Sequence, residues 1–271
     1  MPDRKIRVEV QDRVATLYLS NPPMNVVTLD LTRQMNAALN HLANDADVGA
    51  LVLAGEGDRA FCAGSDIKEF PGLIAEQAIV SKKLGYENET YSAVAHFPKP
   101  TIAAIERLAL GGGLELAAGC DLVIASEDAR LGLPEVLLGG FPGSGGTVRV
   151  TRRIGFGRAS EMMLLGDAID AETARQWGLV NRVAPKGSAL ALARELAARL
   201  ASAAAQATYA CKVALRYAFD LPEQEAIART LDLSEALSQT PDFLEGVTAF
   251  REKRRANFEG TLDIAAFEVT R

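Results

Sequence analysis

The order of strand-like and helix-like patterns along the chain constrains its fold most strongly. Up to Gly143, short apolar runs alternate with amphipathic helical segments, and beyond Gly143 the pattern is helical almost throughout. Strand–helix–strand alternation favours an α/β arrangement. The 271 residues suffice for one large domain, or for one domain with a small appendage. We therefore expect an α/β fold over residues 1–200 and a helical C-terminal region over residues 201–271.

The spacing of apolar residues predicts the individual elements. Strands are expected at 7–10, 14–19, 49–54, 101–105 and 121–125. Helices are expected at 28–42, 74–95, 113–118, 159–165, 171–177, 189–202, 204–217, 222–237 and 241–256. Thr28 is a suitable N-cap for the first helix, because its hydroxyl can accept from a free N–H of the first turn.

Charge and hydropathy argue against two classes of partner. The 29 basic and 35 acidic side chains give a net charge of −6, whereas binding to nucleic acid needs a basic surface. No segment has the roughly 18 uncharged apolar residues of a membrane span. The longest candidate, 108–124, is interrupted by Glu115 and Asp121. We expect neither a nucleic acid nor a membrane as partner.

The cysteines and the first residues indicate the compartment. Cys62, Cys120 and Cys211 are odd in number, widely spaced and set among apolar residues, which predicts buried thiols in a reducing environment. Residues 1–10 are charged and lack the apolar core of a signal peptide. A cytoplasmic location is expected. No His, Cys and acidic residues have the spacing of metal ligands, so no metal site is expected.

Glu115 is an unusual residue, because it stands alone in the apolar, glycine-rich segment 110–118. Burying a carboxylate is costly and raises its pKa, so such acids are rare unless they are paired or functional. The glycines at 111–113 allow a ligand to approach main-chain N–H groups at a helix N-terminus. The alternative is an ordinary helix start with one solvated glutamate.

Glu135 repeats this pattern in the apolar segment 131–138. Pro134 suits the first turn of a helix, where Glu135 would merely interact with the helix dipole. Two acids in apolar settings, one of them beside a glycine-rich N–H cluster, are also what proton transfer to a polarised carbonyl compound requires.

The segment 61–69 supplies a third feature. It places Ala-Gly-Ser just before a short expected helix, where a further main-chain N–H can be presented. An oxyanion hole needs two such donors that converge from different segments.

These segments together resemble the crotonase, or enoyl-CoA hydratase/isomerase, superfamily. The resemblance rests on FCAGSDIKE at 61–69, LALGGGLELAAGCDLVIA at 108–125 and LPEVLLGGFPGSGGTVRV at 133–150, and it extends over about 6–258. It implies a crotonase-like spiral of ββα repeats carrying an acyl-CoA site. It also implies that the C-terminal helices build a homotrimer or a dimer of trimers and help to close the coenzyme A pocket.

The resemblance implies a role for four residues. The main-chain N–H groups of Ser65 and Gly112 would form the oxyanion hole for the thioester carbonyl. Glu115 would orient and deprotonate a water, and Glu135 would exchange the proton at the α-carbon. Together they would perform the syn hydration of a 2-enoyl-CoA to a 3-hydroxyacyl-CoA, or the reverse reaction.

The resemblance also implies contacts with coenzyme A, which is part of the substrate, so that no separate cofactor is expected. The residues at matching positions are Ala63, Asp66, Ile67 and Lys68, and, from a neighbouring subunit, Phe250 and Lys253. The alternative for the lysines is a solvated helix face, since lysine is mostly exposed.

Other activities fit the same scaffold. Relatives that isomerise enoyl-CoA commonly keep only the acid matching Glu135, and dehalogenase-like members use an Asp with a His. Here His41 and His96 lie outside the motifs, which favours hydration. The alternatives are an enoyl-CoA isomerase, a specialised acyl-CoA dehydratase, and a catalytically silent protein that binds coenzyme A or acts as a scaffold.

Two segments depart from simple expectations. Glu106-Arg107 stands where relatives usually have Asn-Gly, and an arginine is strained if that position needs a positive φ. The glycine-rich segment 139–146 superficially suggests a phosphate-binding loop. It lacks the Gly-Lys-Ser/Thr ending of such loops, which argues against nucleotide binding.

Overall fold

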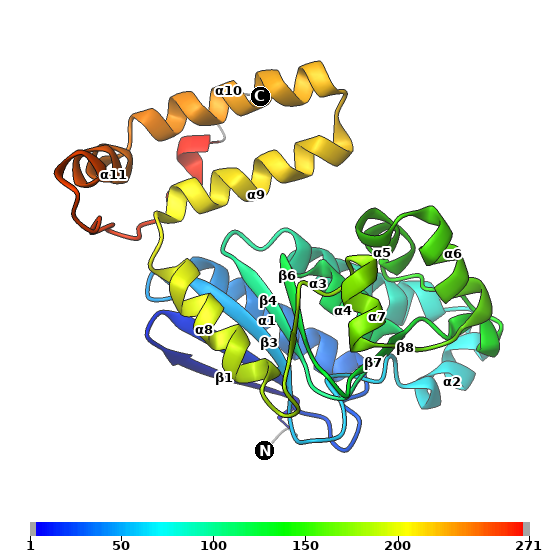
Figure 1. Cartoon of the computed structure of the whole chain (residues 1–271). Helices are drawn as coiled ribbons and strands as arrows, with labels where there is room; N and C mark the ends of the chain where they lie inside the picture. Colours follow the sequence, from blue (N-terminus) through cyan, green and yellow to red (C-terminus); the bar gives the residue numbers. More distant parts are fainter. Residues whose placement is uncertain (1–3, 268–271) are drawn as a thin grey trace.

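The computed structural model describes residues 4–267, which form a layered α/β body and a projecting set of C-terminal helices (Figure 1). The larger sheet has the order β1-β2-β3-β4-β6-β9, and it is parallel except for the antiparallel pair β1 and β2. Its strands are β1 (Ile6–Gln11), β2 (Val14–Leu19), β3 (Ala50–Gly55), β4 (Thr101–Ile105), β6 (Leu122–Ser126) and β9 (Arg182–Ala184). The smaller sheet consists of β5 (Leu108–Leu110), β7 (Arg130–Gly132) and β8 (Ile169–Asp170).

The helices account for most of the remaining chain. Those of the body are α1 (Leu29–Asn44), α2 (Phe70–Ala75), α3 (Gly85–Ala95), α4 (Gly112–Gly119), α5 (Gly146–Ile154), α6 (Phe156–Leu165), α7 (Ala171–Trp177) and α8 (Ala189–Ala201). The projecting helices are α9 (Ala205–Asp220), α10 (Glu223–Ser238) and α11 (Pro241–Glu252). Short helical turns occur at η1 (Ile67–Glu69), η2 (Val80–Leu84), η3 (Glu135–Leu138) and η4 (Ala265–Phe267).

The central strands of the larger sheet are buried on both faces. On β3, Leu51 and Leu53 pack into the core cluster that contains the apolar side chains of α1, whereas Val52 and Ala54 pack into the cluster that contains those of α8. Strands that are covered on both faces have continuous apolar sequences rather than alternating ones. This explains why the segment around β3 is apolar at nearly every position.

Most of the expected elements are confirmed, including Thr28, whose hydroxyl accepts from the Leu31 N–H at the start of α1. The expected single helix over 74–95 is wrong. The chain turns at Gln77, where φ is 53°, and then forms a π-helical turn before α3 begins. A Cβ on Gly85 would lie 2.9 Å from the Val80 carbonyl oxygen, so glycine suits the end of this wide π turn.

Arg107 takes the left-handed conformation that this turn requires, with φ of 64°. Its guanidinium forms an ion pair with Asp128 at 3.1 Å. The neighbouring Glu106 carboxylate accepts from the Ala189 N–H at 2.7 Å, at the start of α8. The chain therefore keeps the turn without glycine, and both side chains join it to neighbouring segments.

The projecting helices differ from the body in their exposure. Helices α9 and α10 pack against each other, and large apolar side chains on the projecting helices remain exposed: Leu215, Phe219, Ile227, Leu231, Phe243, Leu244, Val247 and Phe250. Cys62 and Cys120 are buried as expected, but Cys211 is exposed on α9, so that prediction is wrong. Apolar neighbours in sequence do not show which face of a helix packs inward.

The chain returns from α11 toward α9 and the body. The Glu259 N–H donates to the Asp242 carboxylate at 2.9 Å, and the Phe267 ring lies 5.4 Å from the Tyr209 ring. The expectations for Met1–Asp3 and for residues 268–271 of the C-terminal tail concern residues outside those described. None of the helices in the described chain combines the length and the apolar character that crossing a bilayer requires.

Candidate active site

Glu115 lies in the first turn of α4 and is 3% exposed. The helix begins after Gly111, which has φ of 53°. A Cβ on Gly113 would lie 2.2 Å from the Cys62 carbonyl oxygen, so only glycine allows α4 to start this close to the segment 61–65. The glycine run therefore fixes where the Glu115 side chain enters the interior.

The glycine-rich segment 139–146 holds the Glu115 carboxylate. The main-chain N–H groups of Ser144 and Gly146 both donate to its Oε1 at 2.8 Å. A Cβ on Gly146 would lie 2.7 Å from the Glu115 Cγ, so a larger residue would displace this side chain. The loop that superficially suggests phosphate binding thus surrounds a carboxylate of the chain itself, at the N-terminus of α5.

Glu135 approaches the same region from η3. A Cβ on Gly111 would lie 3.2 Å from its Oε1, which places the carboxyl group beside the start of α4. Its Oε2 is buried and accepts no hydrogen bond from the residues at 4–267. A buried oxygen without a partner has lost its hydration without compensation, which is typical of a group that awaits a ligand.

The two carboxyl groups interact electrostatically. Burial is the main reason why the pKa of Glu115 rises to about 7, and the charge of Glu135 raises it further, although the N–H donors of Gly146 and Ser144 oppose this. Burial also raises the pKa of Glu135 above its ordinary value. With its pKa at about 7, Glu115 can gain or lose a proton near neutral pH.

The main-chain nitrogens of Ser65 and Gly112 lie close to each other. A Cβ on Gly112 would lie 3.6 Å from the Ser65 nitrogen, and one on Gly64 would lie 3.4 Å from the Gly112 nitrogen. The Val27 N–H donates to the Gly64 carbonyl oxygen, and the Val27 carbonyl oxygen accepts from the Asp66 N–H. In a parallel bridge of this kind, the N–H of the residue between them, Ser65, points away from Val27. Gly112 is the first residue of α4, where N–H groups have no partner within the helix.

Comparisons with known proteins identify the family. Residues 9–261 match the model of the enoyl-CoA hydratase/isomerase family. The chain belongs to the enoyl-CoA hydratase/isomerase family.

Relatives and solved structures agree with this assignment. The chain is 38% identical to the 2,3-dehydroadipyl-CoA hydratase of Escherichia coli over 93% of its length and 98% of the relative's. It is 38% identical to the mitochondrial enoyl-CoA hydratase of Pongo abelii over 91% of its length and 83% of the relative's. The crystal structure of an enoyl-CoA hydratase from Bacillus anthracis superposes with a TM-score of 0.91 at 35% identity, covering 95% of this chain and 100% of that one. The predicted crotonase-like α/β fold is confirmed.

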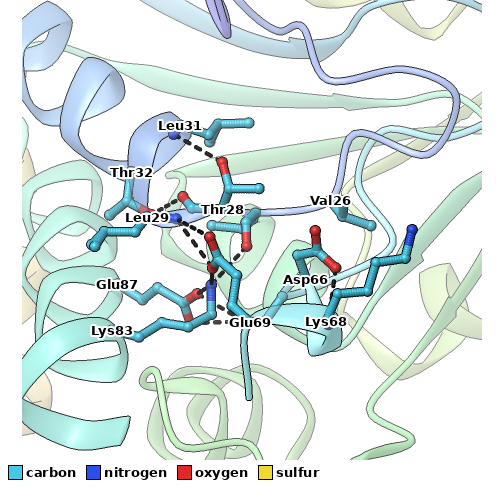
Figure 2. A network of polar contacts seen from close by, with 12 residues as sticks. Val26, Thr28, Leu29, Leu31, Thr32, Asp66, Lys68, Glu69, Lys83 and Glu87 are labelled. Carbon is cyan, nitrogen blue, oxygen red and sulfur yellow. Dashed lines mark hydrogen bonds and ion pairs between the residues drawn. The ribbon is translucent and has the colours of Figure 1, made fainter. Parts of the chain in front are cut away.

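The residues expected to contact coenzyme A from the same chain lie around η1. The Asp66 carboxylate accepts from the Lys68 N–H at 3.1 Å and caps this turn. Ile67 and Lys68 are exposed, whereas Ala63 is partly buried beside the Ser65 segment. Figure 2 shows the Lys68 side chain directed away from the neighbouring cluster of charged groups. These positions remain predictions as ligand contacts.

Phe250 and Lys253 do not join this region within one chain. Both belong to the end of α11, which lies at the opposite end of the molecule from α2 (Figure 1). Phe250 is 85% exposed and borders an apolar groove of about 390 Å³ that Phe243, Val247 and Phe258 also line. Within one chain, these two residues are therefore separate from the residues around η1.

Sequence reasoning missed two charged residues beside the site. Lys83 and Glu87 lie in the segment that the sequence predicts only as a polar helix, yet their side chains are 0% and 1% exposed. Their spacing of four residues, which favours an ion pair on a helix, was the available signal.

In the described chain, no three His, Cys, Asp or Glu side chains gather in a way that could hold a metal ion.

Proposed function

We propose that this protein hydrates a 2-enoyl-CoA to a 3-hydroxyacyl-CoA by syn addition of water, and catalyses the reverse reaction. The observation that carries the proposal is that the buried Glu115 and the half-buried Glu135, which interact electrostatically, lie beside the neighbouring main-chain nitrogens of Ser65 and Gly112. The names of the relatives support the same reaction class.

Each of the four groups has a distinct task. The thioester oxygen accepts from the N–H groups of Ser65 and Gly112, which stabilise the negative charge of the enolate. Ionised Glu115 takes a proton from the attacking water, whose oxygen bonds to the β-carbon. Protonated Glu135 delivers a proton to the α-carbon. The raised pKa of Glu135 favours the protonated form that this step needs.

We also propose the mode of substrate binding and assembly. The coenzyme A moiety lies along Ala63, Asp66, Ile67 and Lys68, with no separate cofactor. A neighbouring subunit supplies Phe250 and Lys253, in a homotrimer or a dimer of trimers in the cytoplasm. The exposed apolar side chains of α9–α11 support a surface that other subunits cover, because monomers seldom expose such continuous apolar area.

The decisive experiment mixes the protein with crotonyl-CoA and follows the loss of enoyl-thioester absorbance. The proposal predicts turnover and a 3-hydroxyacyl-CoA product. Movement of the double bond without added water would indicate an isomerase instead. Binding of coenzyme A without turnover of any short or medium enoyl-CoA would indicate a silent scaffold.

A further inference from the structure

A third carboxylate, that of Glu87, is buried beside the site and has no task in the hydration steps. Glu87 lies in the first turn of α3 and is 1% exposed. Figure 2 shows its carboxylate and that of Glu69 converging on the ammonium group of Lys83. A buried charge persists only when it is paired and hydrogen-bonded, so these contacts define what Glu87 can do.

Lys83 is fully engaged by this cluster. Its Nζ donates to the Val27 carbonyl oxygen at 2.9 Å and to Glu69 Oε2 at 2.6 Å, and it lies 3.1 Å from Glu87 Oε1. An ammonium group has three N–H donors, and these contacts use all of them. Lys83 therefore offsets part of the negative charge of Glu87 and Glu69, which would otherwise oppose an oxyanion forming nearby.

The other partners of Glu87 are two serines of the site. The Ser65 hydroxyl lies 2.8 Å from each of the two Glu87 carboxylate oxygens, and the Ser144 hydroxyl lies 3.4 Å from Oε2. The main-chain nitrogen of Ser65 lies close to Gly112, and the main-chain N–H of Ser144 donates to Glu115. One carboxylate thus anchors the side chains of two residues whose main-chain N–H groups are assigned to the site.

We propose that Glu87 is a positioning residue for hydration, which holds the oxyanion-hole N–H of Ser65 and the Ser144 loop around Glu115 in register. A carboxylate accepts hydrogen bonds only, so it fixes the direction of each hydroxyl, and with it the peptide that carries it. Lys83 and Glu69 hold Glu87 in turn. This inference rests on the proposed hydration reaction.

A double-mutant cycle tests the inference, with Glu87→Gln, Ser65→Ala and the double variant. Glu87→Gln keeps the size of the side chain but loses an acceptor oxygen and the charge. Because misplacement of a catalytic group by a fraction of an ångström is costly, we expect kcat for crotonyl-CoA hydration to fall roughly tenfold with KM nearly unchanged. Ser65→Ala should lower kcat by roughly threefold, and the double variant should be no slower than Glu87→Gln.

Thr90→Val is the matched control, because Thr90 is equally buried on α3 and its hydroxyl has no partner within residues 4–267. It should retain the wild-type kcat.

Two results would overturn the inference. One is a folded Glu87→Gln variant with wild-type kcat, and the other is a double variant whose loss of kcat equals the product of the two single losses. If Glu87→Gln does not fold, an unchanged kcat in Ser65→Ala overturns it and a lowered one supports it. An inactive wild-type protein would instead contradict the proposed function itself.

Discussion

The two carboxyl groups proposed to be catalytic are held in opposite ways. Glu115 enters from a buried helix start and accepts from two main-chain N–H groups at 2.8 Å. Glu135 comes from the short turn η3, whose residues Val136 to Leu138 are exposed, and its Oε2 has no hydrogen-bond partner in the described chain. The chain itself holds the Glu115 carboxylate, whereas Glu135 Oε2 can gain a hydrogen-bond partner only from a molecule that binds beside it.

This difference matches the tasks of the two groups. A base that aims a water at one carbon gains from a rigid setting, because orientation lowers the entropic part of the barrier. An acid that meets the α-carbon must contact the substrate directly, which agrees with a Glu135 Oε2 that has no hydrogen-bond partner in the described chain. The exposed apolar residues of η3 would then be covered by substrate or by another subunit.

The largest expected effect comes from removing either carboxyl group. Glu115→Gln and Glu135→Gln should each lower kcat for hydration by roughly a hundredfold or more, the usual scale for a general acid or base. Steady-state kinetics with crotonyl-CoA measure this. The exposed Glu195 of α8 provides the control Glu195→Gln, which should retain wild-type kcat. A near wild-type rate in either site variant would remove that residue from the mechanism.

A substitution at Gly146 should disturb Glu115 without disturbing Glu135. The added Cβ of Gly146→Ala would lie 2.7 Å from the Glu115 Cγ, so it displaces Glu115 and leaves Glu135 in place. We expect kcat to fall on the order of tenfold to a hundredfold. Gly157→Ala is the matched control in α6, where the added Cβ meets nothing within 4 Å. Equal activity of the two variants would show that the contact around Glu115 is dispensable.

The pH dependence of kcat/KM should follow the ionisation of Glu115. Because Glu115 must be ionised and burial raises its pKa to about 7, kcat/KM for hydration should fall about tenfold per pH unit below that value. Its pKa is higher in the fold than in the unfolded chain, so ionisation of Glu115 costs stability. Its contribution to the free energy of unfolding is therefore lost as pH rises from about 4.5 to about 7. In Glu115→Gln, denaturant titrations at several pH values should show a smaller loss over this range, and an identical loss would contradict the assignment.

The smallest expected effect concerns the neighbouring subunit. Lys253→Ala should raise KM for enoyl-CoA about two- to fivefold with kcat nearly unchanged, because an exposed charge contributes about 1 kcal/mol or less to binding. Arg199→Ala, at an exposed position of α8, is the control. An unchanged KM in Lys253→Ala would argue against a contact across subunits.

The sequence predicted the parts of this molecule whose patterns are local. Buried strands such as β3 and amphipathic helices such as α1 are visible in apolar spacing, and a lone acid among glycines drew attention to Glu115. Strands of three residues, such as β5 and β7, are too short for any period to show. They were not predicted, although β5 leads directly into the oxyanion-hole segment.

Long-range contacts were hidden from the sequence. The N–H groups of Ser144 and Gly146 lie 29 and 31 positions from Glu115, and Ser65 lies 22 positions from Glu87. Pairings of this kind depend on how segments pack, and no local pattern encodes them. For the same reason, the exposure of Cys211 became visible only once the packing of α9 was known: the neighbouring Lys212 faces the body, whereas Cys211 faces outward.

The identity of the product from crotonyl-CoA in D₂O tests the central claim most directly. Mass spectrometry and NMR should find 3-hydroxyacyl-CoA that carries one deuterium at the α-carbon, on the same face as the new hydroxyl. The Glu115→Gln and Glu135→Gln variants should form it far more slowly. Unchanged crotonyl-CoA with the wild-type protein, or a shifted double bond without added water, would contradict the account.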